Sequence, residues 1–236
     1  MSHLLNVNQF RYGGDNFGYL IHGRKDAVVI DGGAFKEIFD FIQYRKLNLL
    51  FIANTHGHYD HTSGNSHFIR QSNTHALNYH DLIKERKIEL EGENINIYNT
   101  PGHTDDSVCF HAGKILISGD TLFNGTIGNC FSGDLDGYYE TIMKLMSLPD
   151  ETIIYAGHDY VKDAMSFAKM IEPDNEDIPV YLRKYNPNHV LSTLADEFRV
   201  NPYLRFNEAN IIAMLKLRGL PCETNRDRWR SLMTID

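Results

Sequence analysis

Four side chains able to bind a metal ion lie close together in the first third of the chain. They fall in the sequence THGHYDH at residues 55–61 and are His56, His58, Asp60 and His61. Neutral imidazole and ionised carboxylate are the ligands that Zn²⁺ and other borderline metal ions prefer. The apolar run at 49–53 predicts a buried strand just before this segment. Since α/β proteins place their sites on loops that leave the carboxyl ends of strands, the segment predicts a metal site.

Three later turns each add one candidate ligand directly after a predicted strand. These ligands are His103, Asp120 and His158. A single Gly-His turn is weak evidence, but four such segments in this order predict that their strands bring the ligands to one edge of the fold. Asp31 follows the strand expected at 27–30 and is either an acceptor that orients a histidine N–H or a simple turn residue. The other histidines stand in no comparable group and are expected on the surface or in packing roles; they are His3, His22, His67, His75, His80, His111 and His189.

This ordered set of ligands resembles the metallo-β-lactamase superfamily, and the resemblance covers residues 12–160. It implies an α/β fold, an αββα sandwich, with two divalent metal ions at one edge. By the superfamily pattern one ion is held by His56, His58 and His103, the other by Asp60, His61 and His158, and Asp120 bridges them. Two such cations can share one water and lower its pKa toward neutrality, which makes Asp60 and Asp120 the candidate catalytic carboxylates. The ligands suit Zn²⁺, with Fe or Mn as alternatives.

Periodicity predicts a chain that alternates strands and helices up to residue 160 and is helical beyond it. We therefore expect a catalytic domain over 1–160 and a small α-helical domain over 161–236. In the first, strands are expected at 17–21, 27–30, 49–53, 95–98, 108–111, 114–118 and 152–156, and helices at 35–46 and 139–148. In the second, helices are expected at 161–172 and 208–218 and from Thr193 and Asn201 onward, with a loop at 173–187.

The second domain carries segments outside the metal site that resemble the glyoxalase II family of hydroxyacylglutathione hydrolases. They are IEPDN at 171–175, STLADE at 192–197 and NPYLR at 201–205, and they accompany GDTLF at 119–123 and AGHDY at 156–160. The resemblance implies a metal-dependent thioester hydrolase that cleaves S-lactoylglutathione-type thioesters with a metal-bound hydroxide. It also implies that the helical domain helps to bind this small-molecule thioester. A thioester suits such a site because its thiolate leaves without a strong general acid.

The positions that bind glutathione in the family are matched only in part. Tyr160 and Arg226 fit two of them and are the candidate substrate-binding residues. Asn129 stands where the family has a basic residue, Phe131 replaces a tyrosine, and Glu223 occupies a second basic position. Each lost cation should weaken the binding of the two glutathione carboxylates by about 1–3 kcal/mol per contact.

Three other functions stay open on the sequence alone. A hydrolase with the same fold could act on a different thioester or on a lactone, which the substituted glutathione positions favour. An iron persulfide dioxygenase would hold one iron with two histidines and an aspartate, whereas all seven ligand positions are filled here. A non-catalytic metal-storage module is disfavoured by the open, hydrolase-like ligand set.

Composition and charge exclude several classes of partner. Lys+Arg 23 against Asp+Glu 31 gives a net charge of −8, so the chain is a poor general binder of nucleic acid or of an anionic membrane. No run of 18 or more apolar residues is present, and no membrane span is expected. Three unpatterned cysteines and the lack of a visible secretory signal predict a protein of the reducing cytoplasm.

The substituted positions generate a prediction about substrate affinity. We expect weak hydrolysis of S-lactoylglutathione, limited chiefly by KM, because the missing contacts grip a part of the substrate remote from the thioester. Restoring a cation with Asn129→Lys, or replacing the acid with Glu223→Arg, should lower KM several-fold in steady-state kinetics. An unchanged or higher KM in both variants would mean that the pocket is built for something other than glutathione.

Overall fold

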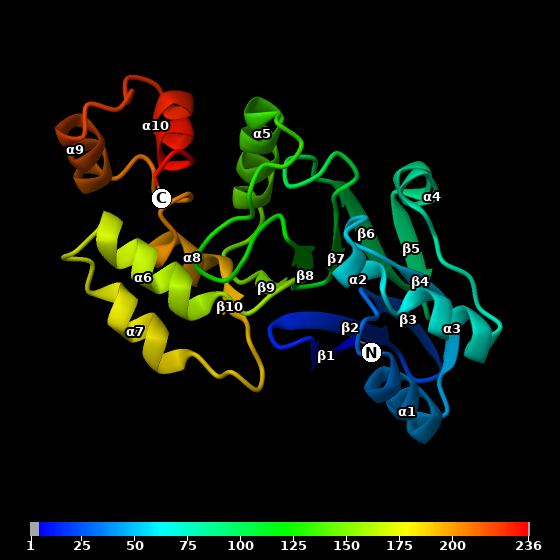
Figure 1. Ribbon diagram of the computed structural model, residues 1–236. Coiled ribbons are helices and arrows are strands. Elements are labelled where there is room, and N and C mark those ends of the chain that lie inside the picture. Colours follow the sequence, from blue (N-terminus) through cyan, green and yellow to red (C-terminus); the bar gives the residue numbers. More distant parts are fainter. Residues whose placement is uncertain (1–4, 236) are drawn as a thin grey trace.

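Two β-sheets packed face to face form the centre of the structure, a computed structural model in which residues 5–235 are described (Figure 1). The first sheet has the order β1-β2-β3-β4, with β1 (Asn6–Tyr12), β2 (Asn16–His22), β3 (Asp26–Ile30) and β4 (Asn48–Ala53). The second has the order β10-β9-β8-β7-β6-β5, with β5 (Lys87–Leu90), β6 (Glu93–Asn99), β7 (Val108–Ala112), β8 (Ile115–Gly119), β9 (Ile153–Ala156) and β10 (Ser192–Thr193).

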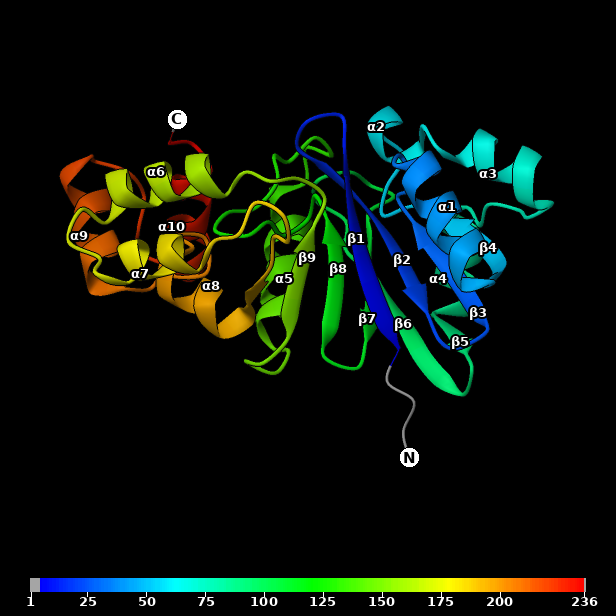
Figure 2. The same ribbon diagram turned by 90° about the horizontal axis from the view of Figure 1, so that it is seen from below.

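Helices cover the outer face of each sheet, which gives the layer order of an αββα sandwich (Figure 2). On the first sheet lie α1 (Phe35–Arg45) and α3 (Asn65–Ser72), and on the second lies α5 (Leu135–Met146). Two short helices, α2 (Tyr59–Thr62) and α4 (Tyr79–Glu85), also fall between β4 and β5 along the chain. The rest of the chain forms α6 (Val161–Ile171), α7 (Asp177–Lys184), α8 (Leu194–Val200), α9 (Ala209–Leu217) and α10 (Asn225–Leu232). The fold class predicted from the sequence is confirmed.

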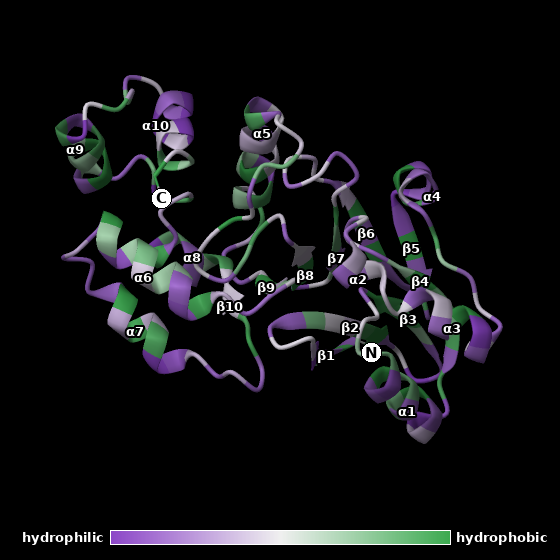
Figure 3. Ribbon diagram, viewed as in Figure 1, coloured by the Kyte–Doolittle hydropathy of each residue, from purple (hydrophilic) through white to green (hydrophobic). Residues whose placement is uncertain are grey.

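Three apolar clusters hold these layers together. One joins the facing surfaces of the sheets and contains Tyr19, Val28 and Phe110. Side chains alternate along a strand, so Leu20 belongs instead to the cluster beneath α1 and α3. The third cluster lies under α5 and the later helices. In Figure 3 the helices α1, α6 and α7 carry both green and purple, as expected for helices with one apolar face. Within residues 5–235 no helix has both the length and the apolar character needed to cross a membrane.

Strand direction explains how distant parts of the chain reach one place. β4 runs parallel to β3, and β9 runs parallel to β8. β7 is antiparallel to both β6 and β8, so β6 and β8 also point the same way. Backbone hydrogen bonds join the two sheets near the carboxyl ends of β4 and β9. Phe17 N–H donates to the Gly157 carbonyl, and Val108 N–H donates to the Thr55 carbonyl, each at 2.8 Å. The carboxyl ends of β3, β4, β6, β8 and β9 therefore meet along one edge of the sandwich.

The differences from the predicted elements fall in short or polar segments. The loop expected at 173–187 contains α7, because Pro179 stands in the first turn, where a missing N–H costs no helical hydrogen bond. The helix expected to begin at Asn201 is wrong, since Asn201 ends α8 and turns follow it. The sequence did not predict β1, β5, β10, the short helices α2, α3 and α4, or α10.

β10 and α10 each tie the later part of the chain to the sandwich. β10 pairs antiparallel with β9 and forms the edge of the second sheet, so residues 161–236 are not purely helical as predicted. α10 packs on α5, where the fully buried Trp229 ring lies 5.7 Å from Tyr138 and 5.8 Å from Tyr139, measured between centroids. The Tyr138 hydroxyl donates at 2.8 Å to the carbonyl of Thr121. This packing therefore reaches the turn that follows β8.

Trp229→Ala tests how much this packing contributes to stability. Removing the ring leaves a cavity between α10 and α5, and we expect the free energy of unfolding to fall by about 3–5 kcal/mol in denaturant titrations. Leu217→Ala in α9 is the control, because Leu217 is 90% exposed and should change stability by no more than about 0.5 kcal/mol. Equal, small effects of both substitutions would contradict the packing of α10 on α5.

Candidate metal centre

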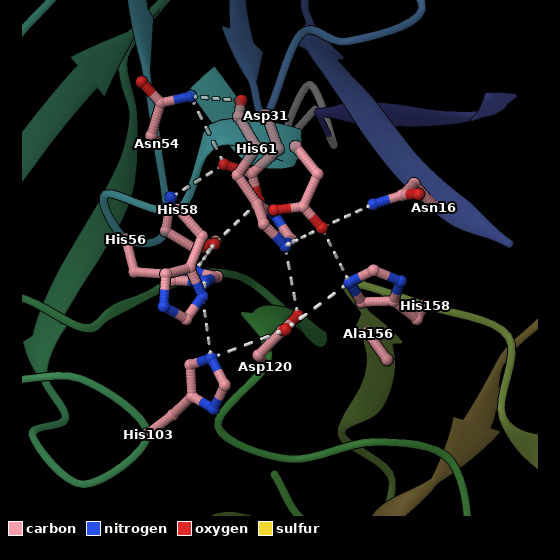
Figure 4. Close-up of polar contacts among 12 residues, drawn as sticks. Asn16, Asp31, Asn54, His56, His58, His61, His103, Asp120, Ala156 and His158 are labelled. Carbon is pink, nitrogen blue, oxygen red and sulfur yellow. Dashed lines mark hydrogen bonds and ion pairs between the residues drawn. The ribbon is translucent and has the colours of Figure 1, made fainter. Parts of the chain in front are cut away.

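Seven side chains from four loops converge at the shared edge of the sheets (Figure 4). The segment after β4 supplies four of them, and the loops after β6, β8 and β9 supply one each. One group contains His56, His58, His103 and Asp120, and the other contains Asp60, His61 and His158. Within each group, one donor atom of every residue lies within 4.8 Å of the others. No other histidine among residues 5–235 joins either group, and His3 lies outside the described residues.

Asp120 lies between the two groups. Its Oδ2 is 3.6 Å from His103 Nε2 and 3.4 Å from His158 Nε2, and its Oδ1 is 3.3 Å from His61 Nε2. Asp60 lies close only to the other members of its own group, with Oδ2 at 3.3 Å from His158 Nε2 and 3.7 Å from His61 Nε2. Both carboxylates thus face the same pair of imidazoles, and Asp120 also reaches the first group.

Two buried atoms at this centre lack a hydrogen-bond partner among the residues that the structure describes. They are His61 Nε2 and Asp120 Oδ1. Buried polar atoms are normally hydrogen-bonded, so these two atoms, 3.3 Å apart and without a hydrogen bond, indicate a place for a ligand. Gly157 keeps the space beside them open, because a Cβ there would lie 2.1 Å from Asp120 Oδ1. The nitrogen and oxygen donors around this space fit divalent metal ions.

Burial and neighbouring charges set the protonation states of these groups. Burial lowers the pKa of His56 to about 4 and also lowers the pKa of His103, so both imidazoles are neutral near pH 7. Burial opposes ionisation of Asp120, but His158 and His61 hold its pKa well below the usual range. Burial would lower the pKa of His61, but Asp31 and Asp120 raise it to about 11. A metal ion that binds His61 therefore displaces a proton.

Asp31 orients His61 from behind the centre. Its buried carboxylate accepts from Thr55 N–H at 2.8 Å, from Thr55 Oγ1 at 2.7 Å and from His61 Nδ1 at 3.0 Å. With Nδ1 committed to Asp31, His61 presents Nε2 toward Asp120. A φ of +53° at Asp31 turns the chain sharply after β3 and places the carboxylate there. The interpretation of Asp31 as an acceptor for a histidine N–H is confirmed.

Other side chains hold the ligands in place without any signal in the sequence. Asn16 donates from Nδ2 to Asp60 Oδ2 at 2.9 Å, across 44 residues of chain. The Tyr12 hydroxyl donates to the backbone carbonyl of Asp60 at 2.8 Å, and Asn54 Nδ2 donates to that of His61 at 2.7 Å. Sequence reasoning missed all three, because Tyr and Asn carry no metal-ligand pattern and two of them lie in the β1–β2 hairpin.

Aromatic rings flank both groups of ligands on the exposed side. Tyr160 stacks on His158 with centroids 5.0 Å apart and an angle of 5° between the planes. Phe131 lies edge-on to His58 at 5.7 Å and to His103 at 5.2 Å, and it is 66% exposed. The side chain of Asp60 is 44% exposed. A molecule that approaches the centre from solvent therefore meets an aromatic ring beside each group.

Arg226 and Arg230 of α10 are already paired with acids of α5. Arg226 forms ion pairs with Asp136, at 3.0 Å, and with Glu140. Arg230 pairs with the same Asp136 at 2.5 Å. Glu223 is exposed just before α10 and adds another negative charge to this region. The two predicted substrate-binding residues thus differ, since Tyr160 lies against a candidate ligand whereas Arg226 lies at the interface of two helices.

Models of known families match the chain almost from end to end. A model described as the metallo-beta-lactamase superfamily matches residues 11–96 and 77–158. A model described as hydroxyacylglutathione hydrolase C-terminus matches residues 159–229. The first covers the sandwich with the candidate metal ligands, and the second covers most of the later helices.

Individual proteins agree with these family matches. A hydroxyacylglutathione hydrolase of Nitrosomonas europaea is 32% identical over 230 residues, which cover 89% of this chain and 86% of that protein. One of Vibrio cholerae is 31% identical over 215 residues, which cover 84% of this chain and 85% of that protein. The crystal structure of ETHE1 from Myxococcus xanthus superposes with a TM-score of 0.67 at 19% identity, covering 97% of this chain and 89% of that one. This structural likeness shows a shared fold.

Asp31→Asn tests whether the acceptor behind His61 matters for metal binding. The amide would turn an N–H₂ group toward donors, release the His61 ring and lower the affinity for a divalent metal ion by about 10–100-fold. The affinity is measured by competition with a chelator of known strength. Asp26→Asn at the start of β3 is the matched control and should leave it unchanged. Equal metal retention by the wild type, Asp31→Asn and Asp26→Asn would contradict the role of Asp31.

Proposed function

The chain belongs to the metallo-beta-lactamase superfamily and, within it, to the hydroxyacylglutathione hydrolase family, and we propose that it hydrolyses thioesters of the S-lactoylglutathione type at a centre of two divalent metal ions. One observation carries this proposal. Seven nitrogen and oxygen ligands form two adjoining groups at an exposed edge of the fold, with Asp120 between them. Such an arrangement suits two ions that act on one substrate.

In this proposal each group of ligands holds one ion. His56, His58 and His103 would hold the first, Asp60, His61 and His158 would hold the second, and Asp120 would be shared by both. When bound, two divalent ions lower the pKa of water and polarise a thioester carbonyl. Zn²⁺ is the ion we expect, because it favours imidazole and carboxylate ligands.

The chain's own residues position the reaction and limit its leaving group. The Asp31 carboxylate holds the ring of His61, and Asn16 holds the carboxylate of Asp60. Asp60 and Asp120 act in catalysis as ligands, so neither remains free to protonate a leaving group. A thiolate departs without protonation more readily than an alkoxide or an amine does. The donor set therefore favours a thioester over an ordinary ester or amide.

Substrate contacts follow from the surroundings of the two groups. The Tyr160 ring, stacked on His158, is placed to contact the thioester substrate. To bind a glutathione carboxylate, Arg226 would have to give up its ion pair with Asp136 or Glu140. We propose residues 161–236 as the substrate-binding domain and residues 1–160 as the catalytic one.

A different thioester or a lactone is the second candidate substrate. Phe131 presents an exposed apolar ring beside His58 and His103 at a position where the family has a tyrosine. Acids already neutralise Arg226 and Arg230. Both features lower the affinity expected for the two carboxylates of glutathione and leave the reaction at the carbonyl unchanged.

Free thiols are consistent with a cytoplasmic protein. The three cysteines, Cys109, Cys130 and Cys222, form no disulfide in the described part of the chain. We therefore propose a reducing compartment, the cytoplasm, as the place of action. The partner we propose is the small thioester itself.

Asp120→Ala tests the two-metal hydrolase directly. Without the carboxylate that lies between the groups, bound metal should fall below two ions per chain and the rate of thiol release from S-lactoylglutathione should fall by orders of magnitude. Metal is counted by elemental analysis after gel filtration. Asp163→Ala on the exposed side of α6 is the control and should retain metal and rate.

Three outcomes would contradict the proposal. Full metal content with near-normal turnover in Asp120→Ala would remove the bridging role. Turnover that survives exhaustive chelation would place catalysis elsewhere. One tightly bound iron in the wild-type protein, with oxygen consumption and no hydrolysis, would favour the persulfide dioxygenase reading of the same fold.

A further inference from the structure

A fully buried carboxylate lies in residues 161–236, the second part of the chain, far from the candidate metal ligands in the sequence. Glu197, in α8, is 0% exposed. Its Oε1 accepts from Ser192 Oγ at 2.6 Å and from the Tyr181 hydroxyl at 2.8 Å. Its Oε2 accepts from the backbone N–H of Gly125 at 2.8 Å and from Asn201 Nδ2 at 3.0 Å. These four donors occupy the four lone-pair positions of an ionised carboxylate.

Glu197 and its neighbours hold three consecutive residues of one turn. The 124–126 turn lies at the tip of a small hairpin after Asp120, in which Leu122 bridges to Ile127. Its contacts with the second part of the chain are Asn124 Nδ2 to Ser192 Oγ at 2.7 Å, Gly125 N–H to Glu197, and Asn201 Nδ2 to the Thr126 carbonyl at 3.1 Å. Ser192, Glu197 and Asn201 belong to the STLADE and NPYLR segments, which contribute no metal ligand.

The chain that leaves this turn runs directly onto the metal centre. Gly128 packs so tightly that a Cβ there would lie 2.0 Å from the Asp120 carbonyl oxygen and 2.9 Å from His103 Nδ1. The next residue, Asn129, accepts from His103 Nδ1 through its backbone carbonyl at 2.9 Å. Phe131 then donates its N–H to the His103 carbonyl at 3.0 Å. Two residues separate Thr126 from the carbonyl that fixes the His103 ring.

We propose that Glu197 is a positioning residue of the metal centre, which fixes the 124–126 turn and through it the His103 ring and Phe131. The proposal rests on the thioester hydrolase function proposed above and gives the second part of the chain a task besides substrate binding. Glu197 touches neither the substrate nor a candidate ligand. It acts through the backbone of residues 125–129.

The carboxylate is the group that this task requires. It receives two N–H donors and two hydroxyl donors, and the Ser192 hydroxyl that donates to it also accepts from Asn124, the first residue of the turn. In Glu197→Gln one side-chain oxygen becomes an N–H₂ group. It cannot accept from Gly125 and Asn201, and if it points to Ser192 and Tyr181 instead, the hydrogens of their hydroxyls lose this acceptor. Because Glu197 is closed to solvent, the orphaned donors have no water to turn to, and the network that holds the 124–126 turn is weakened.

A second buried carboxylate of the same part of the chain provides a matched control. Glu172 is 1% exposed and accepts from Arg205 Nε at 2.7 Å, from Arg205 Nη2 at 2.8 Å and from Asn210 at 2.6 Å. It holds the later helices to one another, and its hydrogen bonds go to Arg205 and Asn210, outside residues 121–131. Glu172→Gln thus perturbs a buried carboxylate of this region and leaves the 124–126 turn untouched.

The test compares Glu197→Gln and Glu172→Gln by three readouts. In hydrogen exchange of the metal-free proteins, peptides within 121–131 should exchange at least tenfold faster in Glu197→Gln than in the wild type and at the wild-type rate in Glu172→Gln. Chelator competition should show at least tenfold weaker metal retention in Glu197→Gln alone. Hydrolysis should show kcat reduced tenfold or more in Glu197→Gln and within twofold of the wild type in Glu172→Gln.

The outcomes separate positioning from plain stabilisation. Faster exchange at 121–131, weaker metal retention and lower kcat in Glu197→Gln alone would support the proposal. Equal changes in both variants, or wild-type metal retention in a folded Glu197→Gln, would overturn it. Should Glu197→Gln fail to fold, Ser192→Ala removes one donor of the same network. It should then show the same three changes to a smaller degree, and no change in any of them would overturn the proposal.

Failure of the proposed function would look different. A wild-type protein that hydrolyses no thioester would remove that function, while exchange rates and metal retention would still report on Glu197. A wild-type hydrolase whose Glu197→Gln variant keeps protected amides at 121–131 would retain the function and lose only the positioning role.

Discussion

Five imidazoles and two carboxylates must hold their donor atoms close together without filling the space between them, and the rest of the structure depends on this constraint. Within each group these atoms lie within 4.8 Å of one another. A buried charge without partners costs several kcal/mol, and His61 and His158 offset that cost for Asp120 at 3.3 and 3.4 Å. Ligands placed so closely need a rigid backbone, which the edge of two packed sheets provides. The missing side chain of Gly157 then keeps the space open.

The second part of the chain adds no ligand, and its charges act on the centre indirectly. The buried Glu197 reaches the hairpin after Asp120, whereas Arg226 and Arg230 on α10 pair with acids of α5. Those ion pairs fasten α10 to the sandwich and at the same time use up cations that could meet an anionic substrate. The same two arginines, Arg226 and Arg230, would therefore be needed both to pack α10 on α5 and to bind the carboxylates of glutathione.

The sequence predicted the fold class and the ligand loops because both signals are local. Each candidate ligand follows its own apolar strand, and strand direction alone brings the loops to one edge. The residues that position the candidate ligands belong to no comparable sequence pattern. Asn16, the first residue of β2, binds Asp60 from 44 positions away, and no sequence pattern links the two residues. The sequence singles out the STLADE segment only through a resemblance, since no periodicity predicts a carboxylate that accepts from a backbone N–H of a distant turn. Asn201 looked like the start of a helix because an Asn-Pro pair suits one, but its side chain is bound to Glu197 and Thr126.

The most direct test of this account is to locate the metal ions in the wild-type protein. Crystals grown from protein loaded with Zn²⁺ would be measured on both sides of the zinc absorption edge, and the anomalous difference map would be calculated. The account predicts two peaks per chain, one among His56, His58 and His103 and one among Asp60, His61 and His158, with Asp120 in contact with both. A single peak, or peaks away from these seven residues, would contradict it.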